Sequence, residues 1–78
     1  MTMVYLANVP SIETPWGIEC YTQHAHVSID YPIEDQPDYF VIVHWGSGSS
    51  RRFPRFDQAM DYAARAMQQA EQIGRAHV

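Results

Sequence analysis

The stretch YFVIVHWGSGSSRRFPRFDQAMDYAARAMQQA, residues 39–70, changes its hydrophobic period at Pro54. Before the proline the period is two, so that Val41 and Val43 share one face of an extended strand and Ile42 lies on the other. GSGSS then has the composition of a hairpin loop, and a short fourth strand at 51–53 completes a turn-linked pair. This half of the stretch therefore predicts two antiparallel strands.

After Pro54 the apolar residues recur at helical spacing. The stripe consists of Phe56, Ala59, Met60, Ala63, Met67 and Ala70. Asp57 falls in the first turn, where the positive end of the helix dipole favours an acidic side chain. We expect an amphipathic helix at 57–72 that packs on the sheet through its small, alanine-rich face.

Two further strands are predicted upstream, because residues 16–21 and 24–31 also alternate apolar and polar side chains. Residues 1–15 contain Pro10 and Pro15, and we expect a short edge strand or an irregular arm there. The fold class is therefore α+β: an antiparallel four-stranded meander followed by one C-terminal amphipathic helix packed on one face, ββββα.

The pairing register follows if every apolar strand residue faces the helix, because a slip of one residue turns a whole strand over. In the predicted hairpins Cys20 faces Ala25 across a two-residue turn, and Val27 faces Val43. In the last hairpin Val43 faces Phe53 and Trp45 faces Arg51.

Length and composition predict one small domain at 1–72. Nine acidic residues against five basic ones give a net charge of −4, which disfavours direct binding to nucleic acid. Cys20 is the single cysteine, and the apolar runs are far shorter than a membrane span. Without a signal peptide in the sequence, we expect a cytoplasmic protein, in a host cell if a phage encodes it.

Residues 73–78, IGRAHV, resemble a translated sequencing adapter. The codons that would encode them can match that DNA, and the preceding adapter bases complete a codon for Gln72. We therefore interpret 73–78 as a non-native tail and look for function in 1–72.

A polar row is predicted on the sheet face away from the helix, formed by Glu19, His26, His44 and Arg52. His24, His26 and His44 are the candidate ligands of a metal site, because a His-x-His pair presents both imidazoles to one side. Arg52 beside His44 would oppose a cation, so we favour a hydrogen-bonded cross-strand ladder and expect no cofactor.

No catalytic group is predicted, and we expect a protein that is not an enzyme. Cys20 points toward the helix and the histidines point away from it, which separates the thiol from any base. Arg51, Arg52 and Arg55 cluster before the helix, where a phosphate or an acidic partner could dock, but local pairing with Asp57 is favoured.

An apolar patch on the same outer face is the feature that favours a function. Phe40 and Ile42 cannot be covered by a single helix on the opposite face. Together with their neighbours they have the composition of a protein interface: the set is Tyr21, Phe40, Ile42, His44 and Arg52. We expect a protein partner or a homodimer there, and coverage by Met3, Tyr5 and Leu6 of the N-terminal arm is the open alternative.

At the level of length, acidity and strand–helix pattern, the whole chain resembles the small acidic proteins that phages and mobile elements carry against bacterial defence, the anti-CRISPR proteins in particular. The resemblance implies that the protein occludes a basic nucleic-acid-binding surface on a CRISPR effector subunit. The contact would be the outer sheet face or the acidic loop at 30–38, which contains Glu34, Asp35 and Asp38.

Residues 40–70 are also similar in order to the antitoxin partners of small RNA-cleaving toxins, in which a hairpin leads into a helix opened by a Phe or Thr, an acidic pair and an Ala. That resemblance implies the alternative function of toxin binding. A metal-binding sheet protein is the third hypothesis.

Overall fold

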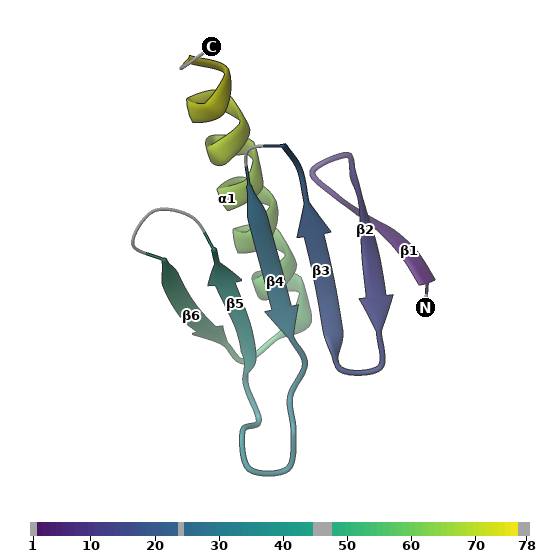
Figure 1. Ribbon diagram of the computed structural model, residues 1–78. Helices are drawn as coiled ribbons and strands as arrows, with labels where there is room; N and C mark the ends of the chain where they lie inside the picture. Colours follow the sequence, from purple (N-terminus) through teal and green to yellow (C-terminus); the bar gives the residue numbers. More distant parts are fainter. Residues whose placement is uncertain (1, 24, 45–47, 77–78) are drawn as a thin grey trace.

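The computed structural model describes residues 2–23, 25–44 and 48–76, and side chains as far as Gln72. The elements are β1 (Thr2–Leu6), β2 (Val9–Thr14), β3 (Gly17–Tyr21), β4 (His26–Asp30), β5 (Tyr39–Val43), β6 (Ser49–Phe53) and α1 (Phe56–Ala76). The strands form one antiparallel sheet in the order of the chain (Figure 1). The predicted α+β meander with one C-terminal helix is confirmed, but the sheet has six strands, not four.

The two additional strands form an N-terminal hairpin, β1–β2, where the sequence suggested an edge strand or an irregular arm. Ala7 and Asn8 make its two-residue turn with positive φ angles of 52° and 66°, which is the geometry that matches strand twist in tight hairpins. Pro10 pairs only with Tyr5 of β1, in a part of β2 that β3 does not reach. A residue without an N–H is tolerated at such a place.

The β4–β5 register is the predicted one, with Val27 opposite Val43 and Ile29 opposite Val41. The β3–β4 register is wrong by two residues, because Cys20 faces Val27 and not Ala25. Thr22 and Ala25 close the connection: the Thr22 N–H donates to the Ala25 carbonyl at 2.8 Å, and the Ala25 N–H donates to Thr22 Oγ1 at 3.0 Å. A longer loop is needed since neither Thr nor Gln favours positive φ.

The β5–β6 register is also wrong, by four residues: Phe53 faces Tyr39, and Ser49 faces Val43. The predicted partner Trp45 lies outside the described residues. Both errors are even numbers of residues, so the paired strand side chains stay on their predicted faces. The errors do change which side chains are neighbours along each face.

Trp16 does not keep its predicted face. Its alternation with Ile18 and Cys20 predicts the helix side, but it lies just before β3 and is 74% exposed.

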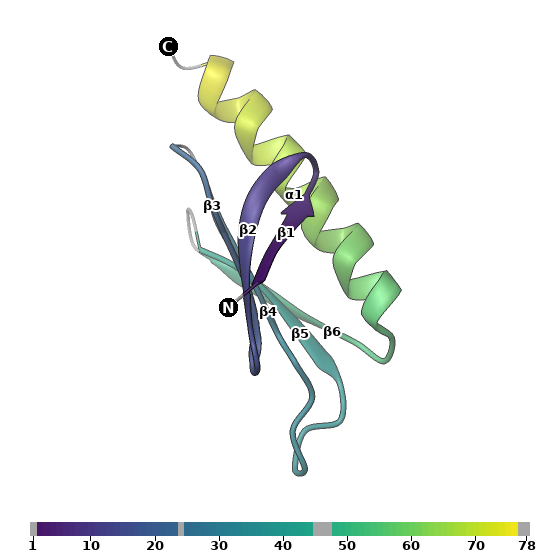
Figure 2. The ribbon, with the colours of Figure 1, turned by 90° about the vertical axis from the view of Figure 1, so that its right-hand side faces the viewer.

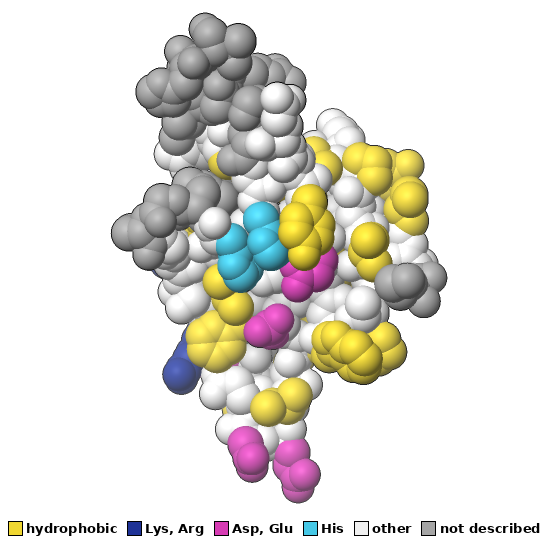
Figure 3. All heavy atoms as spheres, viewed as in Figure 1, with side chains coloured by type: hydrophobic (Ala, Val, Ile, Leu, Met, Phe, Trp, Pro, Cys, Tyr) yellow, Lys and Arg dark blue, Asp and Glu magenta, His cyan; other side chains and the backbone are white. Residues whose placement is uncertain are grey.

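The helix covers one face of the sheet, lying mainly against β4 and β5, and the N-terminal hairpin curls toward it (Figure 2). We call the opposite side of the sheet the open face; it is the side turned to the viewer in Figure 3. Within the described ranges no helix is both long and apolar enough to cross a membrane.

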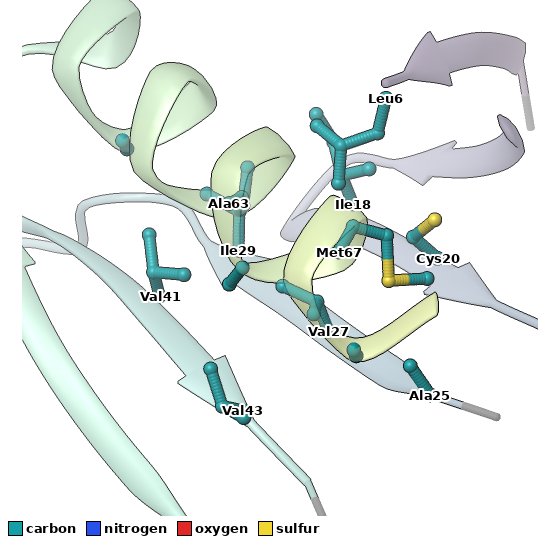
Figure 4. Close-up of a cluster of buried hydrophobic side chains, with 13 residues drawn as sticks. Leu6, Ile18, Cys20, Ala25, Val27, Ile29, Val41, Val43, Ala63 and Met67 are labelled. Carbon is teal, nitrogen blue, oxygen red and sulfur yellow. The ribbon is translucent and has the colours of Figure 1, made fainter. Parts of the chain in front are cut away.

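The core lies between the helix and the sheet (Figure 4). Met67 is fully buried near Cys20 and Val27, and Leu6 reaches the same layer from β1. Ala59 and Ala63 have no exposed surface, and their small side chains let the helix approach the strands closely. The buried hydrophobic set is Leu6, Ile18, Cys20, Ala25, Val27, Ile29, Val41, Val43, Ala59, Ala63, Ala66, Met67 and Ala70.

The helix begins at Phe56, one residue before the predicted boundary. It ends at Ala76 and so includes the first four residues of the suspected tail. Asp57 lies in its first turn as predicted, 3.3 Å from Arg55.

Candidate functional site

The open face is a continuous surface across all six strands. Strand pairing aligns side chains in rows, because directly opposite residues of an antiparallel pair point to the same side. One such row is Met3, Ile12, Glu19, Ser28, Ile42 and Ser50. This surface therefore carries both polar and apolar side chains, and no helix covers them (Figure 3).

A stack of three rings lies in the middle of the open face. His26 lies between Tyr21 and His44, with ring centroids 4.1 Å and 3.9 Å away and planes tilted by 19° and 11°. His26 Nε2 is 2.5 Å from Glu19 Oε2, and His44 Nε2 is 2.9 Å from Ser28 Oγ. The rings are thus held by neighbours on β3 and β4. Of the predicted row, Glu19, His26 and His44 do meet, but Glu19 lies opposite Ser28, and Arg52 lies opposite Phe40 and outside the cluster.

The described residues contain no group of three or more His, Cys, Asp or Glu side chains arranged to hold a metal ion. His26 and His44 stack ring on ring, whereas metal ligands direct their nitrogen atoms to a common point. His24, the third candidate ligand, lies outside the described residues.

Phe40 and Ile42 are on the open face as predicted, and both are half-buried. Arg52 lies over the Phe40 ring, 5.1 Å from its centroid, and not beside His44 as the predicted register required. Next to Phe40 is an open hollow of about 420 Å³. Two strongly exposed side chains, Trp16 and Ile33, form its rim, and Asp30 lines it too.

Acidic side chains lie at several places on the open face and on the β4–β5 loop. Asp30 lies on the wall of the hollow and Glu19 lies beside the ring stack. Glu34 and Asp35 are exposed and Asp38 is half-buried on the β4–β5 loop, whose far end carries carboxylates in Figure 3. Arg52 is the cation that the described strand residues place on this face. The surface therefore has a negative potential, which favours a positively charged partner.

The three arginines expected to cluster before the helix point in different directions. Arg51 lies over the ring of Tyr62 on the helix side, 5.4 Å from its centroid. Arg52 is on the open face, and Arg55 pairs with Asp57. An anion site formed by all three is therefore wrong, because neighbouring residues of a strand face opposite sides.

The N-terminal arm does not cover Phe40 and Ile42. β1 and β5 are separated by three strands, so the arm extends the open face at its far edge. This adds Met3, Tyr5 and Ile12, which are 65%, 63% and 44% exposed and which the sequence reading did not assign to the site. No apolar–polar alternation marks Met3 and Tyr5, because Val4 and Leu6 between and after them are apolar as well.

Cys20 is on the helix side and fully buried, as predicted. Burial raises the pKa of its thiol, and the Glu71 carboxylate adds to that increase against the opposing hydrogen bond with Ser11. A neutral, inaccessible thiol is not a nucleophile. The histidines lie on the other side of the sheet.

Comparison with known proteins found no matching family model, no similar curated protein and no similar solved structure. Function must therefore be argued from the geometry of the open face.

Proposed function

We propose that this protein is a non-enzymatic protein-binding module that uses the open face of its sheet. The observation that carries the proposal is the hollow beside Phe40, rimmed by the exposed side chains of Trp16 and Ile33. A large aromatic residue next to a hollow is the arrangement that concentrates binding energy in protein interfaces. The stacked rings of Tyr21, His26 and His44 lie farther along the same face, and their fixed positions lower the entropy lost on binding.

Charge selects the kind of partner. Glu19, Asp30 and the β4–β5 loop make this side of the molecule acidic, so the partner surface is basic. Nucleic acid is repelled by the same charges. The basic surfaces that proteins expose most extensively are those that bind nucleic acid.

In its specific form, the proposal is that the protein inhibits a bacterial CRISPR defence complex by occupying a basic nucleic-acid-binding surface. The resemblance to small phage and mobile-element proteins suggests this action, in the host cytoplasm. The protein would act stoichiometrically, through contact alone. Occlusion needs a rigid acidic surface of protein dimensions, and the open face with the β4–β5 loop supplies one.

The test measures binding to purified CRISPR effector complexes in competition with their nucleic-acid target. Variants Trp16→Ser and Ile33→Ser should weaken binding at least about tenfold, since each removes an exposed apolar contact without touching the core. Gln69→Ser, on the solvent side of α1, is the matched control and should bind as the parent does.

Binding of effectors that is unchanged by the Trp16 and Ile33 variants would contradict the proposed surface. Absence of binding to every effector tested would contradict the CRISPR assignment. A dimer in light scattering that Trp16→Ser dissociates would identify a second copy of the chain as the partner.

A further inference from the structure

A second cavity lies on the helix side of the sheet, away from the open face. The β1–β2 turn, the β3–β4 connection and the C-terminal half of α1 enclose an open pocket of about 760 Å³. Its walls include Val9 and Met67 as apolar side chains and Glu71 as an acid. The pocket is large enough for a small organic ligand.

Glu71 has an unsatisfied oxygen in this pocket. Its Oε1 atom is buried and has no hydrogen-bond partner among the side chains that the structure describes, which end at Gln72. A carboxylate oxygen removed from water without a donor costs free energy, and native proteins rarely leave such atoms unpaired. Burial is the main cause of the raised pKa of Cys20, and the Glu71 carboxylate raises that pKa further. Glu71 therefore lies close enough to affect the buried thiol. Within the described side chains, Glu71 thus has an acceptor atom without a donor, and its carboxylate is part of the pocket wall.

The other walls define the chemistry of that donor. Among the nine described residues that line the pocket, Glu71 alone is charged. Asn8, Gln23 and Gln68 bring neutral amides, whose oxygens accept further hydrogen bonds from N–H groups. Val9, which is half-buried, offers apolar surface to an alkyl chain. An anion would be repelled by Glu71, and one carboxylate among amides is too few ligands for a divalent metal.

We propose that this pocket binds an alkylguanidinium or alkylammonium group, with the cation hydrogen-bonded to Glu71 and its alkyl chain against Val9. The group is carried either by a free small amine or by an arginine or lysine side chain of another protein. Both sources share the chemistry that the pocket recognises: several N–H donors on a positive charge at the end of a short apolar stem.

The test titrates the protein with agmatine, followed by calorimetry and by amide chemical shifts. Saturable binding with shifts at Asn8 and Gln68 is expected. Glu71→Gln should weaken it at least about tenfold, because a charge-assisted hydrogen bond becomes a neutral one. Glu34→Gln, which removes an acid from the exposed β4–β5 loop, is the matched control and should bind agmatine as the parent does.

Glu71→Gln has to be folded for this comparison. We expect it to melt at or near the temperature of the parent, since Glu71 is half-buried and the change replaces a carboxylate with an unpaired oxygen by a neutral amide of the same shape. Agmatine should raise the melting temperature of the parent more than that of Glu71→Gln. Equal binding by the two proteins, or no saturable binding by the parent to agmatine or to the arginine peptide described next, would overturn the proposal.

A short peptide with a central arginine, and the same peptide with citrulline, separate the two sources. Tighter binding of the arginine peptide than of agmatine would assign the pocket to a protein side chain, and the reverse would assign it to a free amine. Trp16→Ser, on the opposite side of the sheet, should leave agmatine binding unchanged. Trp16→Ser therefore tests the open face alone and Glu71→Gln tests the pocket alone, so that failure of one proposal can be told from failure of the other.

Discussion

His26 and His44 stack face to face on the open side of the sheet, with ring centroids 3.9 Å apart. The contact follows from the backbone, because the His44 N–H donates to the His26 carbonyl at 2.9 Å just beyond the last residue of β5. Tyr21 extends the stack on the other side. Three side chains from adjoining strands thus form one rigid unit where the proposed partner would bind.

Replacing His26 with alanine should remove both stacking contacts and the pair with Glu19. Aromatic pairs contribute about 0.5–1.5 kcal/mol each, and exposed ion pairs typically contribute less than ~1 kcal/mol. We expect His26→Ala to lower the free energy of unfolding by about 1–3 kcal/mol, measured by urea denaturation. Glu19→Gln should cost less than ~1 kcal/mol. A His26→Ala loss no larger than that of Glu19→Gln would contradict a structural role for the stack.

Met67 anchors the helix to the sheet, and its truncation should be more costly. The side chain is fully buried near Cys20 and Val27. Met67→Ala should lower the free energy of unfolding by about 2–5 kcal/mol, because it loses buried apolar area and leaves a cavity. Gln69→Ala, two residues away on the exposed side, is the matched control and should stay within ~0.5 kcal/mol of the parent. Similar losses for both variants would contradict the packing of α1.

Tyr31 should make folding sensitive to alkaline pH. Burial raises the pKa of its hydroxyl above the ordinary value of 10, and the hydrogen bond to Glu13 and the charge of that carboxylate raise it further. Because the pKa is higher in the folded state, the Tyr31 hydroxyl loses its proton more easily in the unfolded chain. Its contribution to stability is therefore complete below about pH 10 and falls as the pH rises above that value.

Tyr31→Phe should therefore flatten the alkaline decline in stability, measured by urea midpoints from neutral pH to above pH 10. Tyr5→Phe, at an exposed position on β1, controls for the loss of a tyrosine hydroxyl. An unchanged alkaline slope in Tyr31→Phe would show that the hydroxyl is not shielded in the folded protein.

Cys20 should resist thiol reagents until the protein unfolds. It is fully buried, and burial raises the pKa of its thiol. Thiolate is the reactive form, so iodoacetamide labelling at pH 8 should be at least about 100-fold slower in the folded protein than in urea. Rapid labelling of the native protein would contradict the position of Cys20 beneath the helix.

The sequence predicts which face of the sheet each side chain lies on better than it predicts which side chains lie next to each other. Alternation assigns Val41, Val43 and Ile42 to their correct sides, since a wrong side would bury polar groups. It does not decide between registers that differ by two or four residues, because these keep the same faces. Arg52 was consequently placed beside His44, whereas it lies over Phe40.

Features that depend on distant parts of the chain were not predictable in the same way. The prolines of residues 1–15 indicated an irregular arm, but Pro10 falls where β2 has one neighbour only, and this depends on where β3 ends. The Glu71 pocket joins two turns to helix residues that lie 44 or more positions later in the chain, counted from Gln23 to Met67. No local pattern marks such a site.

The β1–β2 turn allows a stabilising substitution. Ala7 has a φ of 52°, a left-handed conformation that a Cβ atom makes unfavourable by roughly 1–2 kcal/mol. Glycine has no such penalty, and its partial loss of apolar contact at this half-buried position is small. Ala7→Gly should therefore raise the free energy of unfolding by about 0.5–1 kcal/mol, which urea denaturation can measure.

Ala64→Gly is the matched comparison, because Ala64 is also half-buried but lies within α1. There the same change should destabilise the protein by about 1 kcal/mol, since glycine is unfavourable inside a helix. Opposite signs for the two variants would support the tight turn at Ala7 and Asn8. Destabilisation by Ala7→Gly would instead mean that the N-terminal hairpin closes through a different turn, and Met3 and Tyr5 would then lose their places on the open face.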